Sequence, residues 1–432
     1  MAPDVFAKRR GGGEVYLADP YTDERQGVPG VIPPMRTAEY WVARDRAREG
    51  PQDRAVAASL VRSGLLDLDQ VASLPEPTTV PQEPPTAFRA DGRPWDADAW
   101  QGLVRRLQRT RVIPGDLGVT VGRVSLRTWP TEEPAFRDPH DREFDRWQVT
   151  RVHTCDPVRI LAATDDGWLF AASSIAAGWV PAAGVARAAP DIWESLRRPV
   201  DPVVIVGAGV VTEAEPYHPE VAHRSLEFGA WLPPSGGSNV GGQHRMGHIG
   251  VLCPVRQRDG WLELRPALIK DDGRARQGFL ACERASLLRT AFSQLGDRYD
   301  WGDRLGHHDC SSLVMDAYRT MGVQIPRNSR VQSLFLPHRI RWTPADDIRR
   351  RLGELEEARP GDLLHMPGHV LMHLGSVDGV PYALHAFVGY GMEQDGETAP
   401  VLVNAVEVSP LTLRTRRGPR FVEVLTGVSN IL

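Results

Sequence analysis

The sequence predicts a multidomain protein of the α+β class, and three observations support this prediction. The chain has 432 residues, about three times the roughly 150 residues of an ordinary domain. Apolar residues near the N-terminus recur at helical spacing, whereas the middle of the chain alternates short apolar runs with turns rich in Gly and Pro. The last part of the chain, roughly 150 residues and so about one domain, mixes both patterns.

Composition excludes several classes of protein. With 41% hydrophobic and 25% charged residues, the chain is close to the globular average, which excludes wholesale disorder. The net charge of −4 argues against a nucleic-acid-binding protein. The four cysteines include no C-x-x-C pair, so neither a zinc knuckle nor a dense disulfide framework is expected. No apolar run approaches the ~20 residues of a membrane-spanning helix.

The start of the chain, MAPDVFAKRRGGG, contains basic residues without an apolar stretch behind them. No signal peptide is therefore predicted. A cytoplasmic location is expected for the sequence as it stands, and a periplasmic or secreted location if an export signal has been removed.

The first 115 residues are predicted to form a helical clip. Residues 1–35 are rich in Gly, Pro and charge and favour an extended arm. Helical spacing predicts helices over 38–48 and 54–66, and a third over 96–108 that Asp96 caps. The five prolines of residues 75–85 indicate a linker or strap.

From about Gly118 the sequence is typical of short strands and turns. Two stretches share the letters D-G-W-L, one beginning at Asp166 and the other at Asp259. In each, Asp-Gly is typical of a hairpin turn. One strand–turn–strand module used twice predicts two small, diverged barrels over residues 116–195 and 196–280, an ordinary size for small domains.

The stretch around Cys310 carries the strongest chemical signal. Asp309 is a natural helix N-cap, which puts Cys310 in the first turn of a helix whose apolar face includes Leu313 and Ala317. Free N–H groups and the positive end of the helix dipole are expected there to stabilise a thiolate. The same N–H groups suit an oxyanion.

A base is available downstream. In the strand after Pro367-Gly368, period-two alternation puts His369 and His373 on one face, and His385 falls on the next strand. A hairpin brings His369 and His385 side by side as a base and the residue that orients it. His373 remains an alternative base.

A metal site is the competing interpretation of these histidines. His365, His369 and His373 have the four-residue spacing that aligns ligands on a helix. Pro367-Gly368 interrupts any helix there, and no Glu follows the first His. We therefore expect no metal.

Six ordered motifs in residues 280–430 resemble the NlpC family of papain-like cell-wall peptidases. They are Tyr299-x-Trp-Gly, Asp309-Cys310-Ser311, Ile325-Pro-Arg-Asn-Ser, Pro360-Gly-Asp-Leu, His369-Val and Leu384-His-Ala. The preceding part resembles the longer family members, which carry an N-terminal clip and two bacterial SH3-like barrels. The resemblance implies a clip over 1–115, SH3-like barrels over 116–195 and 196–280, and a papain-like α+β catalytic domain over 281–432.

The resemblance also implies a reaction. Such enzymes hydrolyse the γ-D-glutamyl–diamino acid bond of peptidoglycan stem peptides such as L-Ala-γ-D-Glu-diaminopimelate, without a cofactor. By position, Cys310 is the nucleophile, His369 the base and His385 the third catalytic residue. The residues matching Tyr299, Asp309 and Ser311 hold the free amine of an N-terminal L-alanine in similar enzymes, whose first barrel narrows the cleft. No partner protein is indicated.

Four positions depart from the family pattern, and one of them is His373, which replaces a common aromatic residue. Ser312 and Leu371 stand where the family usually has glycine, and Asp303 replaces the second glycine after the Trp. Leu371 is expected to narrow the floor of the site. Two other functions stay open: an amidase or acyltransferase with the same catalytic residues, and a non-catalytic wall-binding protein.

Overall fold

The computed structural model describes residues 34–45, 50–61, 64–71, 83–394 and 397–432. The expected arm of residues 1–33 and most of the expected strap at 75–85 lie outside these ranges. Within these ranges, the N-terminal part contains the helices α2 (Ala38–Val42), α3 (Arg54–Val61) and α4 (Ala97–Gln108). The carboxylate of Asp96 accepts a hydrogen bond from the N–H of Ala99, which confirms the predicted cap. Helix α2 is shorter than predicted because it ends at Val42.

A seven-stranded antiparallel sheet follows, in the order β3-β2-β6-β5-β4-β1-β7. Its strands are β1 (Arg111–Thr120), β2 (Val124–Arg127), β3 (Gln148–Val152), β4 (Pro157–Ala163), β5 (Trp168–Ala172), β6 (Ala177–Pro181) and β7 (Val185–Arg187), and helix α5 (Pro190–Arg197) comes next. Strand β1 crosses the expected boundary at 115/116, so the sheet begins earlier than the sequence pattern indicated.

Residues 203–277 form small antiparallel sheets around a core of their own. The strands are β8 (Val203–Ile205), β9 (Val210–Val211), β10 (Ser225–Leu226), β11 (Trp231–Leu232), β12 (Asn239–Val240), β13 (Gln243–His244), β14 (His248–Arg256), β15 (Leu262–Lys270) and β16 (Ala275–Gln277). Both D-G-W-L stretches lie at hairpin turns, with Gly167 and Gly260 at φ 93° and 90°. The two tryptophans differ, because Trp168 is buried and Trp261 is exposed.

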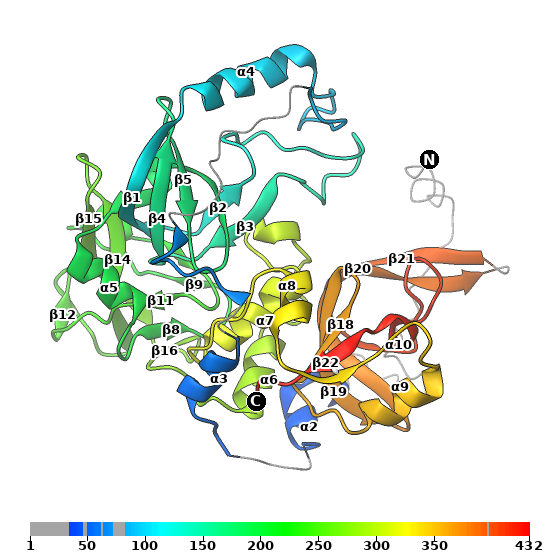
Figure 1. Ribbon diagram of the computed structural model, residues 1–432. Helices are drawn as coiled ribbons and strands as arrows, with labels where there is room; N and C mark the ends of the chain where they lie inside the picture. The colour runs from blue at the N-terminus through cyan, green and yellow to red at the C-terminus, as the bar shows by residue number, and fades with distance from the viewer. Residues whose placement is uncertain (1–33, 46–49, 62–63, 72–82, 395–396) are drawn as a thin grey trace, which may run out of the picture.

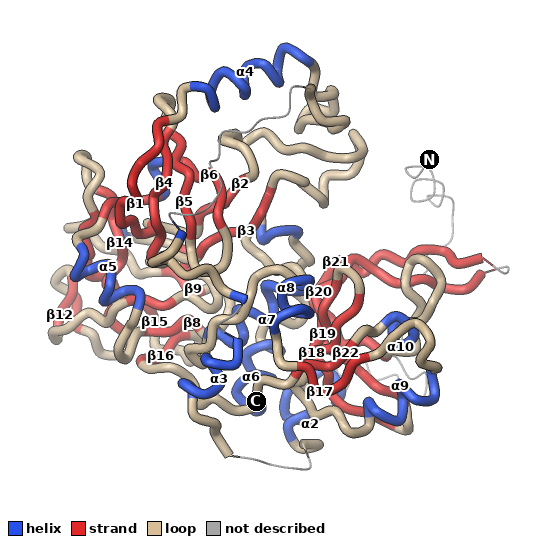
Figure 2. The backbone as a smooth tube through the Cα atoms, in the orientation of Figure 1, coloured by secondary structure: helices blue, strands red, loops and turns tan. Residues whose placement is uncertain are grey.

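The C-terminal part is α+β, as predicted. Its six-stranded sheet has the order β17-β22-β18-β19-β20-β21, and this part of the chain contains both helices and strands (Figure 2). The strands are β17 (His338–Arg341), β18 (Leu363–Met366), β19 (His369–Val377), β20 (Val380–Gln394), β21 (Glu397–Pro410) and β22 (Gly427–Ser429). The helices are α6 (Arg284–Phe292), α7 (Cys310–Arg319), α8 (Ser329–Phe335), α9 (Ile348–Leu355) and α10 (Phe421–Val424).

Helix α7 lies between the first sheet and the C-terminal sheet (Figure 1). Its apolar residues, with Leu313 and Val314 fully buried, pack in one core with Val370 and Met372 of β19. Burial of such side chains stabilises the fold by about 1.5–3 kcal/mol each. The packing fixes the start of α7 beside the start of β19. In the described ranges, no helix is both long enough and apolar enough to span a bilayer.

Candidate active site

Asp309 holds Cys310 at the first position of α7. The Asp309 carboxylate accepts hydrogen bonds from the N–H groups of Ser311 and Ser312, both at 3.0 Å. In return the Ser312 hydroxyl accepts from the N–H of Asp309 at 2.9 Å, which completes a capping box. The predicted N-cap is confirmed. Because the cap occupies these two N–H groups, the Cys310 N–H is the first-turn donor that no contact among the described residues occupies.

His369 and His385 lie side by side, as the hairpin predicted. His369 is the first residue of β19 and His385 lies in β20. The Nε2 atom of His369 lies 2.8 Å from Nδ1 of His385, and the ring centroids are 5.1 Å apart. Since this contact uses Nε2 of His369, Nδ1 is the ring nitrogen that remains for another partner.

The Cys310 thiol lies against the residue that follows His369. The backbone N–H of Val370 hydrogen-bonds to the thiol and favours its ionised form. Burial and the negative charge of Asp309 act more strongly in the opposite direction and raise the pKa of Cys310 to about 12. Desolvation thus opposes the stabilisation of a thiolate that is expected at the helix N-terminus, whereas the backbone N–H groups of Val370 and Ser311 favour it.

Both histidines are neutral in this environment. Burial lowers the pKa of His369 to about 4, against an opposing effect of the Asp309 charge. Burial, followed by the neighbouring His369, lowers the pKa of His385 well below its ordinary value. Burial thus disfavours the charged forms of both the Cys310 thiol and the His369 imidazole.

His373, the alternative base, lies elsewhere. It lines a cavity of about 290 Å³ together with Arg44, Arg359 and Ser376, and Cys310 does not belong to that lining. Within the described part of the chain, neither ring nitrogen of His373 has a hydrogen-bond partner. Burial lowers the pKa of His373 to about 4. The geometry therefore favours His369 as the partner of Cys310.

The three expected amine-binding residues cluster next to Cys310. Ser311 Oγ donates to Asp309 Oδ1 at 2.9 Å. Tyr299 is buried, and burial together with the nearby Cys310 and Asp309 raises its pKa. Arg327 pairs with both Asp309 oxygens, at 3.0 and 2.8 Å, and holds the pKa of that carboxyl near about 2 against the opposing effect of burial.

Sequence reasoning did not assign Arg327 a role, although the motif Ile325-Pro-Arg contains it. A buried arginine eighteen residues from its carboxylate partner leaves no periodic signal in the sequence. Among the described residues, no group of three or more His, Cys, Asp or Glu side chains has the arrangement to hold a metal ion.

Comparison with known families agrees with this geometry. The profile of the NlpC/P60 family matches residues 296–393, which include Cys310, His369 and His385. The C-terminal part of the chain therefore matches the NlpC/P60 family of cysteine peptidases over residues 296–393. An SH3 domain of the SH3b1 type matches residues 134–181, inside the expected first barrel. The second SH3-like barrel, over 196–280, stays a prediction.

Individual relatives are distant. Dipeptidyl-peptidase 6 of Lysinibacillus sphaericus is 35% identical over 94 residues, a match that covers 21% of this chain and 30% of that protein. An NlpC/P60 endopeptidase from Photobacterium damselae subsp. piscicida superimposes with a TM-score of 0.69 at 16% identity, covering 87% of this chain and 90% of that one. This likeness shows a shared fold. An NlpC/P60 family protein from Bacillus cereus gives a TM-score of 0.44 at 18% identity, covering 66% and 83%.

The seven-stranded sheet directly contacts the loop that precedes Cys310. The Gln148 side chain donates to the carbonyl of Gly302 at 2.9 Å, and the indole N–H of Trp301 donates to the carbonyl of Asp145 at 3.0 Å. Gly302 has φ 61°, and a Cβ there would lie 2.7 Å from Gln148 Cγ. The Trp-Gly motif therefore lets the strand β3 approach the loop that precedes Cys310.

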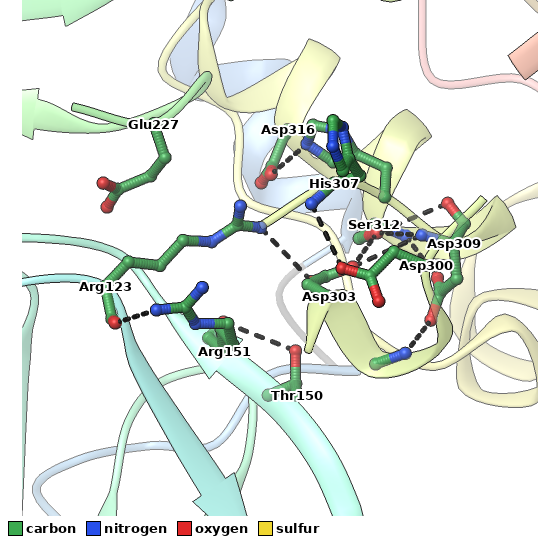
Figure 3. A network of polar contacts seen from close by, with 12 residues as sticks. Arg123, Thr150, Arg151, Glu227, Asp300, Asp303, His307, Asp309, Ser312 and Asp316 are labelled. Atoms are coloured by element: carbon green, nitrogen blue, oxygen red, sulfur yellow. Dashed lines mark hydrogen bonds and ion pairs between the residues drawn. The ribbon is translucent and has the colours of Figure 1, made fainter. Parts of the chain in front are cut away.

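Asp303 and Ser312, two of the residues that depart from the family pattern, lie in one buried polar network (Figure 3). Ser312 Oγ donates to Asp303 Oδ1 at 2.5 Å. Asp303 Oδ2 lies 3.1 Å from Nη2 of Arg327 and 3.6 Å from Nη2 of Arg123, which lies between β1 and β2. Burial raises the pKa of Asp303, whereas Arg327 opposes this shift. The network links the SH3-type region to the start of α7.

The third departure, Leu371, does not narrow the site. It is fully buried in a second core cluster with Trp342, Leu355 and Phe421, and pairs across the sheet with Leu364. The expectation that Leu371 lines the floor of the site is wrong, because in this NlpC/P60 domain the residue packs into that core.

Proposed function

We propose that this chain is a cysteine peptidase that hydrolyses the γ-D-glutamyl–diaminopimelate bond of peptidoglycan stem peptides. The observation that carries the proposal is the Cys310 thiol at the start of α7, which contacts the N–H of Val370. The residue before Val370 is His369, whose imidazole is joined to that of His385 at 2.8 Å. A nucleophile, a base and a residue that orients the base are what acyl transfer through a thioester requires. The two similar proteins described above, by their names an endopeptidase and a dipeptidyl-peptidase, support a peptidase.

The first half-reaction transfers one proton and forms one bond. Because the thiol and the imidazole are both neutral at rest, Nδ1 of His369 takes the thiol proton as Sγ of Cys310 attacks the γ-glutamyl carbonyl carbon. The Cys310 N–H then donates to the oxyanion of the tetrahedral intermediate. Collapse breaks the C–N bond, and His369 gives its proton to the amine of diaminopimelate as this product leaves.

The second half-reaction releases the acyl group. His369, neutral again, removes a proton from a water molecule that attacks the thioester carbonyl. The C–S bond breaks, the thiolate of Cys310 recovers the proton from His369, and L-Ala-D-Glu leaves with a free γ-carboxyl group. Every step uses groups of the chain and water, so the reaction balances without a cofactor.

We propose that Tyr299, Asp309 and Ser311 select a substrate with a free N-terminal amine. Asp309 stays ionised, because Arg327 lowers its pKa, and its negative charge favours an ammonium group. Six donors from the chain already hydrogen-bond to this carboxylate. The amine therefore competes with these donors, and Ser311 Oγ is the donor best able to rotate away.

Mass spectrometry of L-Ala-γ-D-Glu-diaminopimelate incubated with wild type, Cys310→Ala and Cys253→Ala tests the proposal. Cys253 is a buried thiol of the second β region, so its variant is the matched control. We expect release of diaminopimelate by wild type and Cys253→Ala, and none by Cys310→Ala. An N-acetylated peptide run alongside tests the amine selection, which equal cleavage of both peptides contradicts.

Two outcomes favour the rival functions. Transfer of the L-Ala-γ-D-Glu group to an added amine, at a rate above hydrolysis, favours an acyltransferase. Absence of cleavage by folded wild type, together with retention on peptidoglycan, favours a wall-binding protein.

A further inference from the structure

A fourth side chain continues the Cys310–His369–His385 series. Ser409 lies on β21, the strand next to β20, two residues beyond the position opposite His385. Its hydroxyl oxygen lies 2.7 Å from Nε2 of His385. Both side chains are fully buried, so solvent does not compete for this hydrogen bond.

In the part of the chain that the structure describes, the other neighbours of His385 give Nε2 no hydrogen-bond partner. The ring of Phe387 stacks on the imidazole, with 4.0 Å between the ring centroids and an interplanar angle of 9°. The ring of Phe421 approaches the imidazole edge-on, with 5.6 Å between the centroids. Glu407, the residue opposite His385, is paired with Arg36. Nδ1 already contacts His369. Among the described residues, Ser409 is thus the single hydrogen-bond partner of Nε2.

The direction of this hydrogen bond decides which nitrogen of His369 is basic. If Ser409 accepts, Nε2 of His385 carries the proton, its Nδ1 accepts from Nε2–H of His369, and Nδ1 of His369 is free to take the thiol proton. If Ser409 donates, the series reverses and Nδ1 of His369 carries a proton. A base with a proton on the atom facing the thiol cannot deprotonate it.

We propose that Ser409 is a positioning residue of the reaction, which fixes the tautomers of His385 and His369 by accepting a hydrogen bond from Nε2–H of His385. The proposal rests on the proposed function, since it assigns His369 the role of base. It also predicts that the imidazolium formed during attack is stabilised, because His369 then donates to His385 and His385 donates to Ser409.

The same sheet contains a matched control. His365 on β18 and Ser429 on β22 are both fully buried, with Nε2 and Oγ 2.8 Å apart. This pair has the chemistry, length and burial of the His385–Ser409 pair, but His365 has no contact with His369 or Cys310 among the described residues. Loss of either serine hydroxyl should therefore destabilise the fold similarly, whereas only Ser409 should affect catalysis.

The test compares Ser409→Ala, Ser409→Thr and Ser429→Ala with wild type on the tripeptide. Loss of a hydrogen bond to a group that becomes charged predicts a kcat lower by about ten- to a hundredfold for Ser409→Ala, with KM changed less than about twofold. Ser409→Thr restores most of the loss, because it keeps the hydroxyl. Ser429→Ala retains the wild-type kcat. Equal kcat values for the two alanine variants would overturn the proposal.

Two measurements do not depend on the substrate. The rate at which iodoacetamide alkylates Cys310 should fall in Ser409→Ala and not in Ser429→Ala, even if the peptide proves to be the wrong substrate. In the wild type labelled with ¹⁵N-histidine, NMR should show His385 protonated at Nε2. Protonation at Nδ1 would refute the proposal, and this result needs no variant to fold.

Discussion

The hydroxyl of Ser312 donates a hydrogen bond of 2.5 Å to the carboxylate of Asp303. Both residues stand where the resembling family has glycine, so the two departures are in contact. Asp303 has φ 60°, a left-handed conformation that glycine adopts freely and Asp with more strain. The N–H of Asp309 donates to both partners, at 2.9 and 3.3 Å. The pair thus holds the residue that precedes Cys310.

This contact predicts that Asp303 and Ser312 are energetically coupled. Asn tolerates the left-handed backbone and Ala keeps the helix, so Asp303→Asn and Ser312→Ala change the contact with little effect on the backbone. Urea unfolding of both single variants and the double variant should give a coupling free energy of about 0.5–3 kcal/mol. Additivity within about 0.5 kcal/mol would contradict the prediction.

The pKa values of Cys310 and His369 predict the pH dependence of thiol reactivity. With the thiol pKa raised to about 12 by burial and His369 neutral above a pKa of about 4, the thiolate fraction rises about tenfold for each pH unit across the neutral range. Alkylation of Cys310 by iodoacetamide, followed by mass spectrometry from pH 6 to 10, should rise accordingly. The Cys310→Ala variant gives the background from the other cysteines. A rate independent of pH between 5 and 8 would indicate a resting ion pair instead.

Asp316 predicts a pH-dependent contribution to stability. Its buried carboxylate lies 3.0 Å from Nε2 of His153 in the SH3-type region and 3.1 Å from Nε2 of His308. Burial alone would raise the pKa of Asp316, but the two histidines lower it well below its ordinary value. A carboxyl with a folded-state pKa below its unfolded value of about 3.9 stabilises the fold above that pH, and this stabilisation is lost as the pH falls further.

Asp316→Asn tests this contribution. We expect it to lower the free energy of unfolding by about 1–3 kcal/mol at pH 7, and the difference from wild type should shrink as the pH falls below about 4. Asp272→Asn is the control, because Asp272 forms an exposed ion pair with Arg274 and should have a much smaller effect. If the difference in the free energy of unfolding between wild type and Asp316→Asn grew at acidic pH, the prediction would be wrong.

Leu371→Ala should reduce stability without changing specificity. Because Leu371 is fully buried in the second core cluster, its truncation is expected to cost about 2–5 kcal/mol in the free energy of unfolding. Leu402→Ala, on a half-exposed position of β21, should cost far less. At a temperature well below the unfolding transition, kcat/KM for the tripeptide should equal that of wild type. A changed preference among peptides would place Leu371 in the site after all.

Local sequence signals were sufficient for the parts of the site that depend on neighbouring residues. Asp309 predicted the start of α7, because an N-cap acts within one turn. The alternation of side chains between the two faces of the strand after Pro367-Gly368 predicted that His369 and His385 lie side by side across a hairpin. The same local reasoning overextended α2 and placed the start of the first sheet too late, because the ends of elements depend on packing.

The sequence by itself determined the class of the C-terminal domain, the place of Cys310 at a helix start and the histidine pair, since each follows from short-range capping, periodicity and ordered motifs. Only the tertiary structure decided the partners of these residues: Arg327 on Asp309, Asp303 on Ser312, and Ser409 behind His385. It also decided that burial opposes ionisation of the Cys310 thiol, an effect contrary to that expected from the helix dipole. Burial and contacts between distant segments depend on how the whole chain packs, and no local pattern encodes the desolvation that sets a pKa.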